Sequence, residues 1–150
     1  MSDAKDDATI AALLPDGVEP RTIAGLWATV DADRSIRDLG RSAERLAADS
    51  LLGASIRLVR DDTNAAIALA EPATEGRLAA TLARFGEGPA GRYIEATDGL
   101  AAVVSRAAAA QIRLSRPAGG PFGRSVLVLG DSAAGPHLIL VERPAGTIDR

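Results

Sequence analysis

Two side chains on predicted strands have the chemistry of a general acid and a general base. Glu95 lies near the end of a predicted strand, and His137, the only histidine, lies at the start of another. A carboxylate that faces inward must be solvated, paired with an arginine such as Arg57 or Arg113, or used on a ligand. A lone histidine is more often a surface or hydrogen-bonded residue than a catalyst. Paired with Glu95 across a cleft, His137 could still move a proton on a bound substrate.

Strand alternation places both residues on one face of the predicted sheet, because side chains two apart point to the same side. The opposite face is uniformly apolar and is expected to lie under helices: Leu26, Ala28, Val30, Ile67, Leu69, Ile94, Ala96, Leu138 and Leu140. The first face mixes aromatic and polar residues, and its predicted ligand-binding residues are Trp27, Thr29, Arg57, Tyr93, Glu95, Arg113, His137 and Ile139. Apolar walls with a few polar groups are typical of a small-molecule pocket. Trp27 and Tyr93 could instead fill the cleft as packing residues.

A sequence repeat within the chain predicts how these strands are arranged. Gly25-Leu26-Trp27 and Gly91-Arg92-Tyr93 open two similar segments, and Leu69-Ala70-Glu71-Pro72 and Val141-Glu142-Arg143-Pro144 close them. A repeat of this size indicates two copies of one supersecondary unit. A paired sheet built from two such units has a cleft between its halves, and the residues that face it decide the function.

Periodicity and turn residues divide the chain into five parts. We expect a flexible arm or a docked single turn over 1–22, a βαββ module over 23–72 and a linking helix over 73–88. A βαβββ module over 89–145 and a tail over 146–150 follow. In the first module the helix carries an apolar stripe, Ile36, Leu39, Ala43, Leu46 and Ala47, before strands near 54–60 and 64–71. In the second, strands are expected near 91–97, 112–116, 124–130 and 136–142.

Several segments resemble the vicinal oxygen chelate superfamily, in particular its glyoxalase, bleomycin-resistance and methylmalonyl-CoA epimerase-like members. They are the run from Leu82 to Gly88, the Arg116–Gly120 hairpin and the closing segment from Leu138 to Glu142. The likeness covers about residues 23–145. It implies an α+β fold, in which two βαβββ-type modules form a curved mixed sheet with a cleft.

The resemblance also implies where a metal would be held, on the first and last strands of each module. Carried over by register, those positions are Gly25, Ala68, Gly91 and Ile139. None has a donor side chain, and a metal site needs three or more protein donors. We therefore expect the fold with its metal ligands lost, no metal and no cofactor.

The first module departs from the family pattern, because one strand between its helix and its closing Glu-Pro is missing or reduced. A shortened module would leave a sheet edge that a second subunit could cover. We therefore expect a homodimer.

Composition limits the remaining classes. The chain has 150 residues, 47% of them hydrophobic, a net charge of −3 and no cysteine. These values favour one compact domain without disulfides, and they offer no basic stripe for nucleic acid. No apolar run is long enough for a bilayer, and the acidic start does not resemble a secretory signal, so a cytoplasmic location is expected.

Three functions remain open. The first is a metal-free protein that binds a small, partly apolar or aromatic molecule. The second is a metal-independent isomerase, epimerase or lyase that uses Glu95 and His137 as catalytic residues. The third is a ligandless dimeric interaction module. The first two need an open cleft, whereas the third needs a filled one.

Overall fold

Two βαβββ modules and an N-terminal helix make up the computed structural model, which describes residues 3–130 and 135–143. The first module and its linking helix are β1 (Thr22–Ala28), α2 (Ala32–Leu39), β2 (Glu44–Asp49), β3 (Ala54–Arg60), β4 (Ala66–Pro72) and α3 (Arg77–Phe85). The second is β5 (Gly88–Glu95), α4 (Leu100–Ala109), β6 (Ala118–Gly120), β7 (Gly123–Leu127) and β8 (His137–Glu142). Helix α1 (Asp3–Leu13) precedes both. No helix in these ranges is long and apolar enough to cross a membrane.

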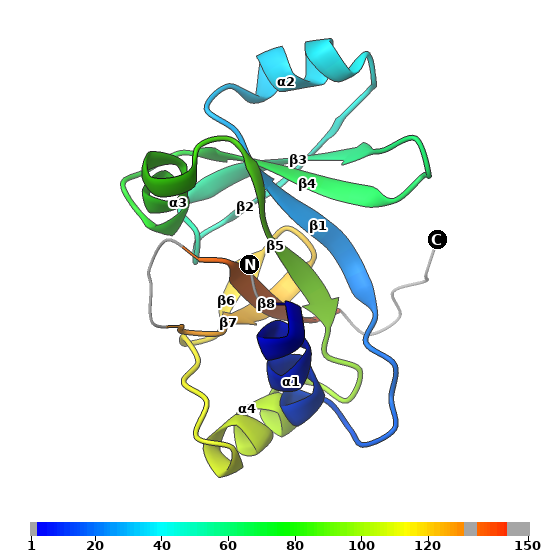
Figure 1. Ribbon diagram of the computed structural model, residues 1–150, viewed down its shortest axis with the longest axis vertical. Helices are drawn as coiled ribbons and strands as arrows, with labels where there is room; N and C mark the ends of the chain where they lie inside the picture. Colours follow the sequence, from blue (N-terminus) through cyan, green and yellow to red (C-terminus); the bar gives the residue numbers. More distant parts are fainter. Residues whose placement is uncertain (1–2, 131–134, 144–150) are drawn as a thin grey trace.

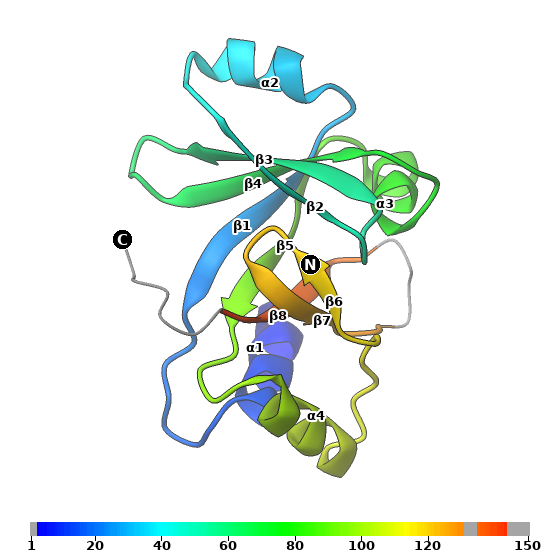
Figure 2. The ribbon, with the colours of Figure 1, turned by 180° about the vertical axis from the view of Figure 1, so that it is seen from behind.

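The eight strands form one curved mixed sheet in the order β2-β3-β4-β1-β5-β8-β7-β6 (Figures 1 and 2). Within each module the first and last strands pair in parallel, and β1 and β5 join the modules in antiparallel fashion. The sheet curls until its two edge strands approach, and the Ser50 hydroxyl donates to the Gly119 carbonyl across the gap at 3.3 Å. The predicted α+β fold is confirmed.

The prediction of a shortened first module was wrong, because three strands follow α2. Gly40 ends the helix in the left-handed conformation with φ of 65°, and its N–H bonds the Ile36 and Arg37 carbonyls. Ala43, Leu46 and Ala47 therefore lie beyond the helix, and the last two belong to β2. Only Asp49 of β2 is fully buried. Such a polar edge strand carries little of the alternation by which strands are recognised.

Helix α1 replaces the expected flexible arm. Ile10, Leu13 and Leu14 are buried at 2% exposure or less, and they pack with Leu100 and Val103 of α4. Figure 1 shows the two helices side by side on the second module, far from α2. Much of α1 is alanine, so its large apolar residues span only a few positions. This short apolar stretch is why a flexible arm or a single docked turn was expected.

The second module matches the prediction except after α4. The segment near 112–116 forms only an isolated bridge between Leu114 and Val128, and the Ser115 N–H bonds the Leu127 carbonyl. The expected turn over 117–123 contains the short strand β6, which pairs with β7. The linking helix ends at Gly86, as predicted. The predicted tail over 146–150 lies outside the described residues.

Two apolar clusters lie on the two faces of the sheet. The inner face carries Leu26, Ala68, Tyr93 and Ile139 and is enclosed by the curling strands. The outer face of the second module carries, among others, Ile94 and Leu140 and lies under α1 and α4. We use "inner face" for the enclosed side of the sheet and "outer face" for the side toward the helices.

Candidate functional site

Trp27 lies on the outer face, and its predicted place in the cleft was wrong. In the parallel pairing of β1 with β4, Leu26 lies opposite Ala68 and Trp27 lies opposite Leu69. Paired residues share a face, so Leu26 is inner and Trp27 is outer. Trp27 remains 39% exposed. Because Leu26 and Trp27 are both apolar, alternation within β1 could not show which of them faces inward.

Arg57 and Arg113 also lie away from the inner face. Arg57 pairs in register with Leu69 on the outer face, and its guanidinium contacts the Asp33 carboxylate of α2 at 3.0 Å. Arg113 is exposed on the segment between α4 and β6. Neither arginine pairs with Glu95 among the ion pairs of the described residues.

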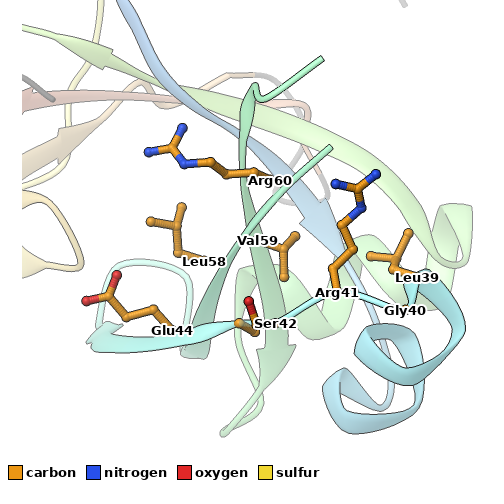
Figure 3. A pocket seen from close by; sticks show the side chains of 9 residues that line it. Leu39, Gly40, Arg41, Ser42, Glu44, Leu58, Val59 and Arg60 are labelled. Carbon is orange, nitrogen blue, oxygen red and sulfur yellow. The ribbon is translucent and has the colours of Figure 1, made fainter. Parts of the chain in front are cut away.

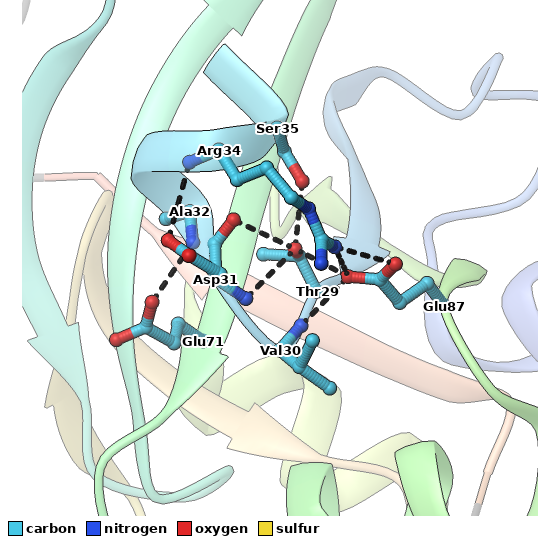
Figure 4. Close-up of polar contacts among 8 residues, drawn as sticks. All are labelled: Thr29, Val30, Asp31, Ala32, Arg34, Ser35, Glu71 and Glu87. Atoms are coloured by element: carbon cyan, nitrogen blue, oxygen red, sulfur yellow. Dashed lines mark hydrogen bonds and ion pairs between the residues drawn. The ribbon is translucent and has the colours of Figure 1, made fainter. Parts of the chain in front are cut away.

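Thr29 is buried in a polar cluster at the start of α2 (Figure 4). Its hydroxyl contacts Glu87 at 2.8 Å and Ser35 at 2.7 Å. Glu87 also accepts from the Val30 N–H and from Arg34. Those donors hold the pKa of Glu87 below its usual value. The cluster fixes a helix terminus and is satisfied by its own members.

The closing glutamates explain the repeat in the sequence. Glu71, near the end of β4, accepts from the Ala32 N–H of α2 at 2.8 Å. Glu142 on β8 accepts from the Leu100 N–H of α4 at 2.9 Å. Each carboxylate accepts a hydrogen bond from an N–H that has no partner within the helix. Its negative charge also lies at the positive end of the helix dipole, which is stabilising. The repeated glutamate thus anchors each module's helix to its own last strand.

Tyr93 and Ile139 lie on the inner face as predicted, but they fill it. The Tyr93 hydroxyl donates to the Asp49 carboxylate at 2.7 Å, and both side chains are buried. The Phe122 ring packs edge-on against Tyr93 with centroids 5.0 Å apart. Burial raises the pKa of Asp49 despite its bonds from Tyr93 and Leu52. Burial together with the Asp49 charge raises the pKa of Tyr93 well above its ordinary value.

His137 lies at the opposite end of the inner face from Glu95. In the parallel β5–β8 pairing, His137 is opposite Gly91 and Val141 is opposite Glu95. Four residues along a strand separate the two levels by about 13 Å. The two residues therefore cannot act together on one small substrate.

The environment of His137 is that of a neutral, structural imidazole. Its ring is 2% exposed, and Nε2 lies 2.9 Å from the Thr81 hydroxyl of α3. The Thr81 hydroxyl also donates to the Arg77 carbonyl at 3.0 Å. Burial, with a smaller contribution from the Arg77 charge, lowers the pKa of His137 to about 4.

The positions that the resemblance implies for a metal do not form a donor set. Gly25 pairs with Ile67 on the outer face, whereas Ala68 and Ile139 are buried in the inner core. Within residues 3–130 and 135–143, no group of three or more His, Cys, Asp or Glu side chains could hold a metal ion. The residues present do not fit the metal that the superfamily's pattern implies.

The inner face opens at one end into a hollow of about 250 Å³ whose walls carry charge. Arg21, Arg60 and Arg143 line it together with Glu95, and Ala66 forms part of its apolar wall. Ala66 also packs against the inner core, so the hollow is the mouth of the inner face. We call this hollow the arginine mouth. Of the predicted site residues, only Glu95 reaches it.

Sequence reasoning missed the three arginines of the mouth. Arg21 was assigned to the arm, and Arg60 was not considered because Arg57, of the opposite parity on the same strand, was assigned to the cleft. Ala54, Ile56 and Leu58 lie on the more apolar face of β3, and Arg60 lies on the same face at the end of the strand. This pattern was the signal that could have found Arg60.

A second, wider hollow of about 690 Å³ adjoins the mouth (Figure 3). It lies between the end of α2, the start of β2 and the end of β3, with Leu39, Arg41 and Leu58 in its lining. Arg41 is paired there with Asp62. Arg60 lines both hollows, and its guanidinium donates to the Asn64 carbonyl at 3.1 Å.

Solved structures of other proteins share this architecture. Methylmalonyl-CoA epimerase from Mycobacterium tuberculosis superposes with a TM-score of 0.71 and 21% identity, covering 89% of this chain and 95% of that one. This protein has the vicinal oxygen chelate fold. A Streptomyces coelicolor methylmalonyl-CoA epimerase in complex with 2-nitronate-propionyl-CoA matches with a TM-score of 0.68 and 19% identity, covering 83% of this chain and 95% of that one. A hypothetical protein from Bacillus halodurans C-125 matches with a TM-score of 0.68 and 14% identity, covering 88% of this chain and 100% of that one.

Comparisons by sequence add no relative: no family model and no curated protein matches the chain. At these identities the vicinal oxygen chelate fold is the shared property, and the activity of the epimerases does not follow from it. The residues of the mouth must carry any functional argument.

Proposed function

We propose that this protein binds a small anionic molecule, partly apolar, at the arginine mouth and without a metal ion. The single observation that carries the proposal is the lining of the mouth, in which Arg21, Arg60 and Arg143 surround about 250 Å³ together with Glu95, which is paired with Arg21. Guanidinium groups bind carboxylate and phosphate oxygens through paired hydrogen bonds. The arginines would hold the anion, and Ala66 would contact the apolar part of the ligand.

The fold supports placing the ligand here. The mouth is the part of the inner face that apolar side chains leave open, whereas Tyr93, Phe122 and Ile139 occupy the centre. Clefts with apolar walls and a few convergent polar groups are the usual small-molecule sites. The metal-independent enzyme that uses Glu95 and His137 loses its support, because the two residues lie at opposite ends of the face.

Isothermal titration with inorganic phosphate and with propionate tests the proposal. Arg60→Ala removes a charged donor from the mouth, and such bonds are worth enough to weaken binding about tenfold or more. Arg45→Ala is the matched control, because Arg45 is an exposed arginine on the neighbouring strand β2 and does not line the mouth. Saturable binding that Arg60→Ala weakens and Arg45→Ala preserves supports the proposal. Absence of saturable binding by both probes, or equal loss in the two variants, contradicts it.

The ligandless dimeric module is the second candidate, and the filled centre of the inner face favours it. Strand β2 is an exposed edge, with Arg45, Ala47 and Ala48 open to solvent, and a second subunit would cover it. Light scattering at tens of micromolar measures the assembly directly. A monomeric mass removes this candidate, and a dimer that binds neither probe favours it over the binding protein.

A further inference from the structure

We infer that the ligand carries a hydrogen-bond donor beside its carboxylate, as a small 2-hydroxy or 2-amino acid does; this inference rests on the proposed binding at the arginine mouth. The observation behind it is the acidic residue among the arginines. Glu95 lines the same hollow as Arg21, Arg60 and Arg143. Glu95 forms an ion pair with Arg21, and a donor on the ligand would share its carboxylate.

Backbone contacts hold Glu95 in place. Its N–H bonds the Arg21 carbonyl at 2.9 Å, which joins the end of β5 to the residue before β1. By strand alternation from the buried Tyr93, the Glu95 side chain is directed to the inner side of the sheet, and 20% of it is exposed. The carboxylate is therefore positioned at the mouth by the sheet itself.

The ion pair with Arg21 leaves Glu95 able to accept from a ligand. Oε2 lies 3.6 Å from the Arg21 Nε, which is an ion-pair distance and longer than a direct hydrogen bond. A carboxylate has two oxygens and about four acceptor sites. An incoming hydroxyl or ammonium group can use them without displacing Arg21.

Electrostatics then discriminates between ligands. A simple carboxylate that binds the arginines also approaches the negative charge of Glu95, and like charges at short distance are unfavourable. A hydroxyl or ammonium on the neighbouring carbon converts that repulsion into a charge-assisted hydrogen bond. The mouth therefore favours acids with such a donor over acids without one.

The size of the hollow suits small acids. A three- or four-carbon acid fits within its volume of about 250 Å³, and a longer ligand would extend beyond the hollow.

Propionate, lactate and alanine form a matched probe series, since the three differ in the group on the carbon next to the carboxylate. Isothermal titration of the unmodified protein should give binding of lactate or alanine about tenfold tighter than binding of propionate. Preference for alanine identifies an ammonium donor, and preference for lactate identifies a hydroxyl.

Glu95→Gln supplies the diagnostic change, because it removes the negative charge and keeps the shape. Propionate should bind this variant more tightly than it binds the unmodified protein, while the advantage of the donor-bearing acid should shrink to about twofold. Glu95→Asp keeps the charge and should keep the order of affinities, and Arg45→Ala should change nothing. Circular dichroism melting confirms that each variant is folded.

The outcomes separate this inference from the proposal beneath it. Equal affinity of the unmodified protein for all three acids, with loss of binding in Arg60→Ala, overturns the donor requirement and leaves the anion site standing. An unchanged advantage of the donor-bearing acid in Glu95→Gln also overturns it. Absence of Arg60-dependent binding of any of the three acids overturns both.

Discussion

Protonation of His137 should make the folded protein less stable as the pH falls below 6.5. The folded state holds the imidazole neutral with a pKa of about 4, and an unfolded chain has a histidine pKa near 6.5. Between these values the unfolded state binds the additional proton, so the free energy of unfolding decreases with decreasing pH. The stabilisation is complete above pH 6.5 and is lost as the pH falls through 4.

The size of the effect follows from the difference in pKa. The lowering from 6.5 to about 4 corresponds to about 3 kcal/mol once both states are protonated. At pH 5 the histidine accounts for about 2 kcal/mol of lost stability relative to pH 8. Asp49 titrates in the opposite sense, because burial raises its pKa and its protonated form is favoured in the folded state.

Comparison with His137→Gln isolates the histidine, since both proteins keep Asp49. The glutamine amide can still form a hydrogen bond with the Thr81 hydroxyl in place of the imidazole. Urea unfolding followed by circular dichroism at pH 8, 6 and 5 should show a difference in stability between the two proteins that changes by about 2 kcal/mol over this range. Parallel stability profiles would refute the reasoning, because they would mean that His137 titrates normally in the folded state.

Three further predictions test the inner face and the closure of the sheet. Tyr93→Phe leaves the buried Asp49 with one donor fewer and should lower the free energy of unfolding by about 1–3 kcal/mol; an unchanged urea midpoint would count against the pair. Ser50→Ala removes the hydroxyl that donates to the Gly119 carbonyl between the two sheet edges and should lower the free energy of unfolding by about 0.5–1 kcal/mol; a variant as stable in urea as the unmodified protein would contradict this contact. Trp27, 39% exposed, should be quenched by acrylamide to the same extent with and without saturating ligand, whereas protection by the ligand would place the site on the outer face.

Part of the fold could be predicted because local signals agreed with it. The apolar spacing of Leu78, Leu82 and Phe85 and the stop at Gly86 predicted α3 correctly. Strand β8 followed from its continuous apolar run, and Ile94 and Leu140 fall under the helices as alternation indicated. These assignments depend on contacts within a few residues, which the order of residue types determines.

The candidate site was harder to predict, because it depends on how strands pair. Strand β1 has register shifts against β5 between Thr22 and Ala24 and between Leu26 and Trp27. Such irregularities change which residues of two strands lie opposite each other. Thr29 and Arg57 were assigned to the cleft by counting along the chain, and the pairing directs them to α2 instead.

The sequence by itself determined the repeat of two modules and most of the helices and strands. Only the tertiary structure decided which side of β1 faces inward, that Tyr93 and Phe122 fill the centre, and that Arg21, Arg60 and Arg143 meet beside Glu95. The physical reason is range. Local periodicity depends on residues that are close in sequence. The mouth, in contrast, forms where one curved sheet brings together the ends of strands that are distant in sequence.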